Sequence, residues 1–156
     1  GHNKAIVCQE ALKAINKDTE IKVEPLMLTT LNARKILQDH DLVMDVLDNV
    51  EARFIAVKYC KALGIPLVHG AIGGFYGHVA NIFPEDDILQ YLYPDGADSP
   101  PGLEATMGNP VFTPQLVAAV QCCEALKILA GRDNILRKAM LHIDMLNNSY
   151  DVIEFS

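Results

Sequence analysis

The segment 41–53 holds the residues whose types and spacing best suit chemistry. Its short apolar run delivers Asp45, Asp48 and Asn49 directly before a helical pattern that contains Arg53. Ligands of open α/β sheets bind at the carboxyl ends of the strands, and a carboxylate there can hold Mg²⁺ against the phosphates of a nucleotide. The alternative interpretation is that Asp48 or Asn49 only caps the helix that follows.

The spacing Asp-x-x-Asp-Asn-x-x-x-Arg of this segment resembles the metal and nucleotide segment of the ThiF/MoeB/HesA family. Three further stretches follow the order of that family along almost the whole chain. They are Gly1-x-x-Lys4-Ala5, which opens a helix ending in Ile15-Asn16; Gly64-Ile65-Pro66 with Gly70-Ala71 and Tyr76-Gly77-His78-Val79; and Glu124-Ala125-Leu126-Lys127 with Gly131.

The resemblance implies an adenylyltransferase that uses ATP and Mg²⁺ to activate the C-terminal carboxylate of a ubiquitin-like or sulfur-carrier protein. It implies that Asp48 is the catalytic acid linked to Mg²⁺ and that Lys4 contacts the ATP phosphates as a second catalytic residue. Asn49 and Arg53 would support the nucleotide pocket or the corner between strand and helix. The resemblance also implies a homodimer. Without it, Lys4 is a solvated surface lysine and Arg53 is a salt-bridge partner within its helix.

The chain departs from the family pattern in ways that keep other functions open. The Gly-rich phosphate loop of the family lies upstream of Lys4, so residues 1–156 correspond to the later part of a ThiF-like nucleotide-binding domain. Paired C-x-x-C zinc motifs are absent, and residues 95–111 contain no cysteine for a thioester. We therefore expect adenylation without thioester transfer. The alternatives are a non-catalytic scaffold or partner subunit of the same family, and a fragment of a dinucleotide-binding oxidoreductase.

Composition narrows the possible partners and the compartment. The chain has 156 residues, a length typical of one domain, and a net charge of -7 without a basic run. We therefore expect no nucleic-acid or membrane partner, because nucleic acids and anionic membranes both bind clustered Lys and Arg. No apolar run approaches the roughly 18 residues that span a bilayer. The cysteines in helical patterns suggest buried reduced thiols and a cytoplasmic protein; His69, His78 and His142 receive no role.

Periodicity and turn residues predict the elements that position these groups. Thr113 is expected to cap the last helix, which is apolar nearly all round and so should be buried. The alternation of helices and strands at the front of the chain predicts parallel βαβ units. The order as a whole predicts a Rossmann-like α/β fold: a three-layer arrangement with helices on both faces of the sheet and an antiparallel C-terminal extension. We expect helices over 4–16, 31–39, 50–63 and 114–130, strands over 21–28, 41–47, 67–71 and 76–83, a crossover loop over about 84–111, and a hairpin formed by 140–146 and 150–155.

Overall fold

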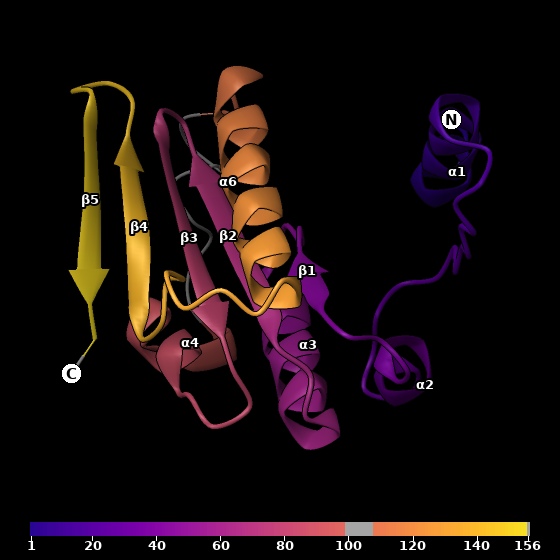
Figure 1. Ribbon diagram of the computed structural model, residues 1–156, viewed down its shortest axis with the longest axis horizontal. Coiled ribbons are helices and arrows are strands. Elements are labelled where there is room, and N and C mark those ends of the chain that lie inside the picture. The colour runs from indigo at the N-terminus through magenta and orange to yellow at the C-terminus, as the bar shows by residue number, and fades with distance from the viewer. Residues whose placement is uncertain (99–107, 156) are drawn as a thin grey trace.

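The computed structural model of the protein describes residues 1–98 and 108–155. Within these ranges one sheet has the strand order β1-β2-β3-β4-β5, as Figure 1 shows. Strand β1 runs parallel to β2, and the remaining neighbours are antiparallel. The strands are β1 (Val43–Asp45), β2 (Leu67–Gly73), β3 (Tyr76–Ile82), β4 (Ala139–Asp144) and β5 (Ser149–Glu154).

Helices cover both faces of this sheet, so the fold has three layers (Figure 1). Side chains alternate along β2: Leu67 packs with α2 (Ala33–Leu37), α3 (Val50–Leu63) and α4 (Ile88–Leu92), whereas Val68 packs against α6 (Phe112–Leu129) on the opposite face. This alternation is the period of two of a strand buried on both sides. The predicted Rossmann-like α/β class with an antiparallel C-terminal hairpin is confirmed.

Helix α3 occupies the range expected from its terminal residues. The Asn49 side chain accepts a hydrogen bond from the Ala52 amide at 2.8 Å, which satisfies one of the unpaired amides of the first turn. Gly64 ends the helix with φ 74°, a left-handed conformation that favours glycine. These two residues fix α3 and, with it, the position of Arg53.

Helix α6 packs closely on the sheet because two glycines leave room for it. A Cβ on Gly70 would lie 2.4 Å from the Gln121 side chain, and one on Gly77 would lie 2.5 Å from Cγ2 of Val117. The prediction that Thr113 caps this helix is wrong, since Val111 occupies the cap position. The Thr113 hydroxyl instead donates to the Gly74 carbonyl at 2.6 Å and joins the helix to the turn after β2.

The prediction that α6 is buried all round is also wrong. Its sheet-facing side includes polar residues, Thr113, Gln121 and Glu124, whereas Leu126 is 67% exposed. The polar side chains are buried because each bonds to the sheet or to a neighbouring loop. The outer surface of α6 therefore carries the apolar residues that were expected in the core.

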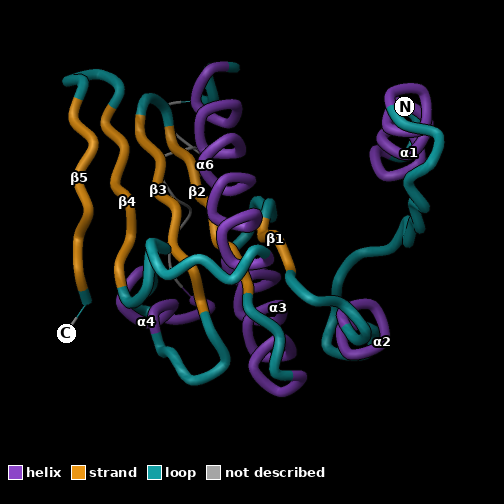
Figure 2. The backbone as a smooth tube through the Cα atoms, viewed as in Figure 1, coloured by secondary structure: helices purple, strands orange, loops and turns teal. Residues whose placement is uncertain are grey.

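The N-terminal part of the chain departs most from the predicted elements. Helix α1 (Lys4–Ile15) forms as expected, but residues 21–28 form no strand and run as an irregular segment toward α2, drawn as loop in Figure 2. A strand requires a partner, and β1 pairs only with β2 among the described residues. Pro25 also lacks the amide that a central strand would use. Helix α2 and strand β1 are shorter than predicted.

The long segment after β3 contains more structure than a loop. Its described beginning holds α4 and the 3-10 turn η1 (Gly96–Asp98), so the prediction of a continuous loop is wrong there. Residues 99–107 of the predicted crossover lie outside the described residues. The predicted hairpin at the end of the chain is confirmed as β4 and β5.

The cysteines are free but mostly not buried. Cys60 lies in the core beside α2 and β2, whereas Cys8, Cys122 and Cys123 are exposed. The expectation of buried thiols in the helical patterns is therefore wrong for these three, because α1 packs on no core and both cysteines of α6 face away from the sheet. Among the described residues, the helices are too short or too polar to cross a membrane.

Candidate active site

The corner between β1 and α3 is built by hydrogen bonds to its backbone. Asp45 is buried, and its Oδ1 accepts from the Leu47 amide at 3.0 Å. Gln121 of α6 donates through Nε2 to the Asp45 carbonyl at 2.9 Å and to the Val68 carbonyl at 3.2 Å. Because β1, β2 and α6 all hold this corner, residues 46–48 have a defined course at the carboxyl end of the parallel strand pair.

Arg53 holds the same corner from the other side. Its guanidinium donates to the Leu47 carbonyl through Nη2 at 2.6 Å and Nε at 3.3 Å, and it also bonds to the Tyr93 hydroxyl. Nε lies 3.9 Å from Oδ2 of Asp45. The salt-bridge partner of Arg53 is thus on β1 and not within its own helix. Arg53 supports the strand-helix corner, one of the two roles expected for it.

Asp48 and Asn49 follow this corner, and their side chains have different partners. Asn49 caps α3, as the structural alternative anticipated. The Asp48 carboxylate is exposed and has the Asn49 amide within 3.4 Å. It lines a pocket of about 240 Å³ between the end of β1, the later half of β2 and the N-terminal half of α6. The described lining also includes Arg53, Gly70, Ala71, Ile72, Asn109, Pro114, Val117, Ala118 and Gln121.

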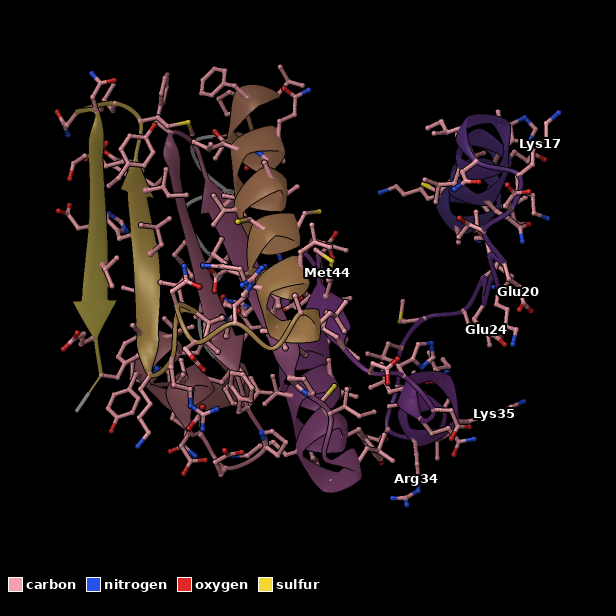
Figure 3. The ribbon with its side chains drawn as sticks, viewed as in Figure 1. Lys17, Glu20, Glu24, Arg34, Lys35 and Met44 are labelled. Atoms are coloured by element: carbon pink, nitrogen blue, oxygen red, sulfur yellow. The ribbon has the colours of Figure 1, made fainter. Side chains whose placement is uncertain are left out.

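The structure does not bring Lys4 to this pocket. Lys4 starts α1 and lines a separate surface hollow with Asn3, Glu24 and residues 25–27. Helix α1 stands apart from the sheet in Figure 1, and the side chains of Lys17, Glu20 and Glu24 project around this N-terminal part in Figure 3, away from Met44 on β1. Of the residues expected to bind a nucleotide, Asp48, Asn49 and Arg53 lie together, and Lys4 lies elsewhere.

A buried chain of side chains that joins β1, β2 and β3 was not anticipated from the sequence. His69 Nδ1 lies 2.6 Å from Oδ2 of Asp45, and both side chains are fully buried. His69 Nε2 lies 3.1 Å from Nε2 of His78. Burial, with the neighbouring His69 and Arg53, lowers the pKa of His78 to about 3. The sequence signal was available: three histidines fall at strand positions, but no spacing rule connects them with Asp45.

The Glu-Ala-Leu-Lys stretch of α6 also gains a structural explanation. Glu124 is buried, accepts from Nδ2 of Asn81 at 2.6 Å and from the Leu136 amide at 2.9 Å, and pairs with Lys127. It therefore ties α6 to β3 and to the segment leading into β4. Its partners leave it no part in the pocket.

The pocket suits a metal-linked acid better than it suits a whole nucleotide. Mg²⁺ binds through one or two carboxylates, keeps several waters and takes phosphate oxygens as further ligands, and Asp48 is an exposed carboxylate at the pocket wall. Arg53 is the one cationic residue in the described lining, and its guanidinium is already bonded to Leu47 and Tyr93. Within the described residues no group of three or more His, Cys, Asp or Glu side chains could hold a metal alone. The residues thus fit a metal that a nucleotide shares.

Fold and site define a Rossmann-like α/β domain with an acid at the carboxyl end of its parallel strands. Comparison with known families identifies the family of the protein. The ThiF family matches residues 1–156, and the chain belongs to this family. It is 34% identical over 160 residues to the sulfur carrier protein adenylyltransferase of Thermus thermophilus, covering 96% of this chain and 58% of that protein. It is 27% identical over 158 residues to the SAMP-activating enzyme E1 of Haloferax volcanii, covering 99% of this chain and 58% of that protein.

Solved structures agree with this fold. MccB of E. coli, in a structure with AMPCPP and MccA, superposes with a TM-score of 0.76 at 12% identity, covering 99% of this chain and 48% of that one. PaaA superposes with a TM-score of 0.72 at 12% identity, covering 99% and 55%. At such identities the likeness concerns the fold alone. The chain spans about half the length of these relatives and neighbours, from 48% to 58%.

Proposed function

We propose that the protein takes part in ATP-dependent adenylation of the C-terminal carboxylate of a ubiquitin-like or sulfur-carrier protein. Membership of the ThiF family supports the reaction class, and several relatives carry names of this activity. The observation that carries the proposal is the exposed Asp48 carboxylate on the wall of a pocket at the carboxyl end of β1 and β2.

In the proposed reaction a carboxylate oxygen of the carrier attacks the α-phosphorus of ATP. The bond between the α-phosphorus and its bridging oxygen breaks, pyrophosphate leaves, and an acyl adenylate forms. Mg²⁺ would offset the charge that develops on the phosphates. Asp48 would hold that metal at the pocket wall, while Asn49 and Arg53 keep the corner in place.

Lys4 is the least supported member of the proposed site. It could contact ATP phosphates as a point charge only if α1 lies nearer to β1 than it does in the structure. A charge reversal, Lys4→Glu, separates this role from that of a solvated surface lysine. The first role predicts weaker ATP binding, and the second predicts unchanged binding.

We further propose that the protein is a cytoplasmic homodimer that buries the outer surface of α6. This surface consists of Ala119, Cys122, Cys123, Leu126 and Leu129, all uncharged and exposed. Small residues allow two helices to approach closely. The four free cysteines suit a reducing compartment.

A second function, a non-catalytic scaffold or partner subunit, is favoured by one observation. The described lining of the pocket holds no cationic side chain apart from Arg53, which is bonded to the backbone. Phosphates would therefore need positive charge from outside this lining. A dinucleotide-binding oxidoreductase gains no support, because the family match covers the whole chain.

Calorimetric titration with ATP, with and without Mg²⁺, decides between the two functions. Saturable binding that requires Mg²⁺, is lost in Asp48→Ala and persists in Asp41→Ala supports adenylation. Asp41 is the matched control, because it is also exposed and lies before β1, outside the pocket. If Mg²⁺-dependent binding survives Asp48→Ala, a residue other than Asp48 holds the metal. Absence of binding in the unmodified chain would overturn the catalytic assignments and favour the scaffold.

A further inference from the structure

We infer that His69 is a positioning residue, which fixes the Asp45 carboxylate and through it the backbone that presents Asp48 to the pocket. The inference deepens the proposed function. Its consequence for metal binding rests on the proposal that Asp48 holds Mg²⁺, whereas the positioning of residues 46–48 does not. The ThiF resemblance assigns nothing to this histidine, and the geometry around β1 and β2 carries the inference.

The Asp45 carboxylate has a different partner at each oxygen. Oδ1 accepts from the Leu47 amide at 3.0 Å, and Oδ2 lies 2.6 Å from Nδ1 of His69. Two partners at fixed positions determine the rotation of the carboxylate. That rotation in turn places the Leu47 amide, one residue before Asp48. His69 therefore acts on residues 46–48 through one intervening side chain.

The direction of these hydrogen bonds follows from chemistry. A carboxylate accepts, so Nδ1 of His69 carries the proton in the bond to Asp45. The pKa of His78 is lowered to about 3 by burial, so His78 is neutral at ordinary pH. One proton then lies between the two Nε2 atoms, 3.1 Å apart. Both ring nitrogens of His69 are thus bonded, and its orientation is fixed at both ends.

The charged and titratable groups around His69 come from four elements or connections. Asp45 lies on β1, Arg53 on α3, His78 on β3, and Tyr93 after α4 places its ring edge-on at 5.9 Å. Arg53 cannot replace His69, because its Nε is 3.9 Å from Oδ2 and its other donors are bonded to Leu47 and Tyr93. Loss of the histidine donor would leave Oδ2 of a buried carboxylate without a short hydrogen bond.

A matched pair of variants tests the inference. In His69→Asn the side-chain amide can replace Nδ1 and still donate to Asp45, whereas in His69→Gln the amide reaches toward the Nε2 position and loses that bond. We expect His69→Gln to speed hydrogen exchange of the Leu47 amide, and His69→Asn to retain its protection. The Ala52 amide, held by Asn49 in the next turn, is the internal reference, because general destabilisation would speed exchange at both amides.

The second readout is the Mg²⁺ dependence of ATP affinity in the same variants. Loss of a partner bonded directly to a metal ligand typically weakens metal binding by about 10–100-fold. His69 acts on Asp48 only through Asp45 and the backbone, so we expect a smaller but measurable loss for His69→Gln and little change for His69→Asn. His40→Gln is the control, because His40 is exposed and, among the described residues, its ring hydrogen-bonds only to the carbonyls of Leu37 and Gln38. If the unmodified chain binds no ATP, the proposed function fails, while the exchange measurement still tests the positioning of residues 46–48.

The unmodified protein provides a test that needs no variant to fold. Nitrogen-15 chemical shifts of the His69 ring should show a proton on Nδ1, slow to exchange with water. An unprotonated Nδ1, or equal exchange at Leu47 in His69→Asn and His69→Gln, would overturn the inference.

Discussion

At the scale of the residue, neighbours in sequence have separate tasks around β1. Asn49 caps α3 while Asp48, the next residue back, faces the pocket. Local rules anticipated both interpretations of this pair, because capping and metal binding use the same side-chain oxygens. The bond between Asp45 and His69 joins residues 24 apart in the chain, and no local pattern connects them. Single-sequence reasoning therefore found the exposed Asp48 and missed the buried His69.

Cys60 and Cys8 differ in reactivity for a reason that is visible at this scale. Burial, with the nearby charge of Asp45, raises the pKa of Cys60 to about 11, whereas Cys8 is exposed. Thiolate is the reactive form, so we expect a thiol reagent at pH 8 to label Cys8 quickly and Cys60 only after unfolding. Peptide mapping by mass spectrometry would measure both rates. Equal labelling of the two residues in the folded protein would contradict the buried position.

The same pKa determines how Cys60 affects stability at high pH. The folded-state pKa is raised above its ordinary value of 9.0 to about 11. The unfolded chain therefore loses this proton at lower pH than the folded chain. The contribution of Cys60 to stability is complete below pH 9 and declines as the pH rises from 9 toward 11.

At the scale of the element, sequence-based prediction was accurate where the hydrogen-bonding partners of an element are close in sequence, and it failed where they are distant. Helix α3 was predicted closely because Asn49 and Gly64 mark its ends through local bonds. Residues 21–28 were wrongly predicted as a strand, because their β-compatible residue types do not reveal whether a second strand is available to pair with them. The polar buried side of α6 escaped prediction because Gln121 is satisfied by the distant carbonyls of Asp45 and Val68.

Packing of α6 on the sheet gives a prediction for two residues. In Gly77→Ala the new Cβ would lie 2.5 Å from Cγ2 of Val117, so we expect a loss of stability of about 1–3 kcal/mol from overpacking. Val117→Ala removes the atom that clashes. In the double variant the second substitution should therefore cost less than it does alone. Urea denaturation of the four proteins gives the coupling energy, and simple additivity would show that the two residues do not meet.

At the scale of the whole molecule, the predicted fold class and hairpin were confirmed, but the predicted parallel sheet was reduced to one pair. Strands β1 and β2 alone are parallel among the described strands. Alternation of helical and strand patterns at the start of the chain indicated more βαβ units than form. The family resemblance supplied what periodicity could not, namely the reaction class now proposed for the pocket.

The proposed homodimer gives the prediction at this scale. Leu126→Lys, on the outer surface of α6, should shift the protein toward monomer in analytical ultracentrifugation, because a charge would be buried in the interface. Leu146→Lys is the control, since Leu146 is similarly exposed, at 55%, but lies in the β4–β5 turn. Labelling of Cys122 should rise in parallel with dissociation. A monomeric unmodified protein, or equal effects of both substitutions, would contradict this interface.

Within the described residues, the strand order of the sheet is the same as the order of the strands along the chain. Each new strand therefore adds to the free edge left by the strand before it, and none has to enter between two strands already paired. The sheet can grow in one direction as the polypeptide emerges from the ribosome, from β1 toward β5. The widest gap in this sequence of additions is between β3 and β4, where the chain must first complete α6. Closing that gap is the step that we expect to limit the rate of folding, because non-local pairings are slow.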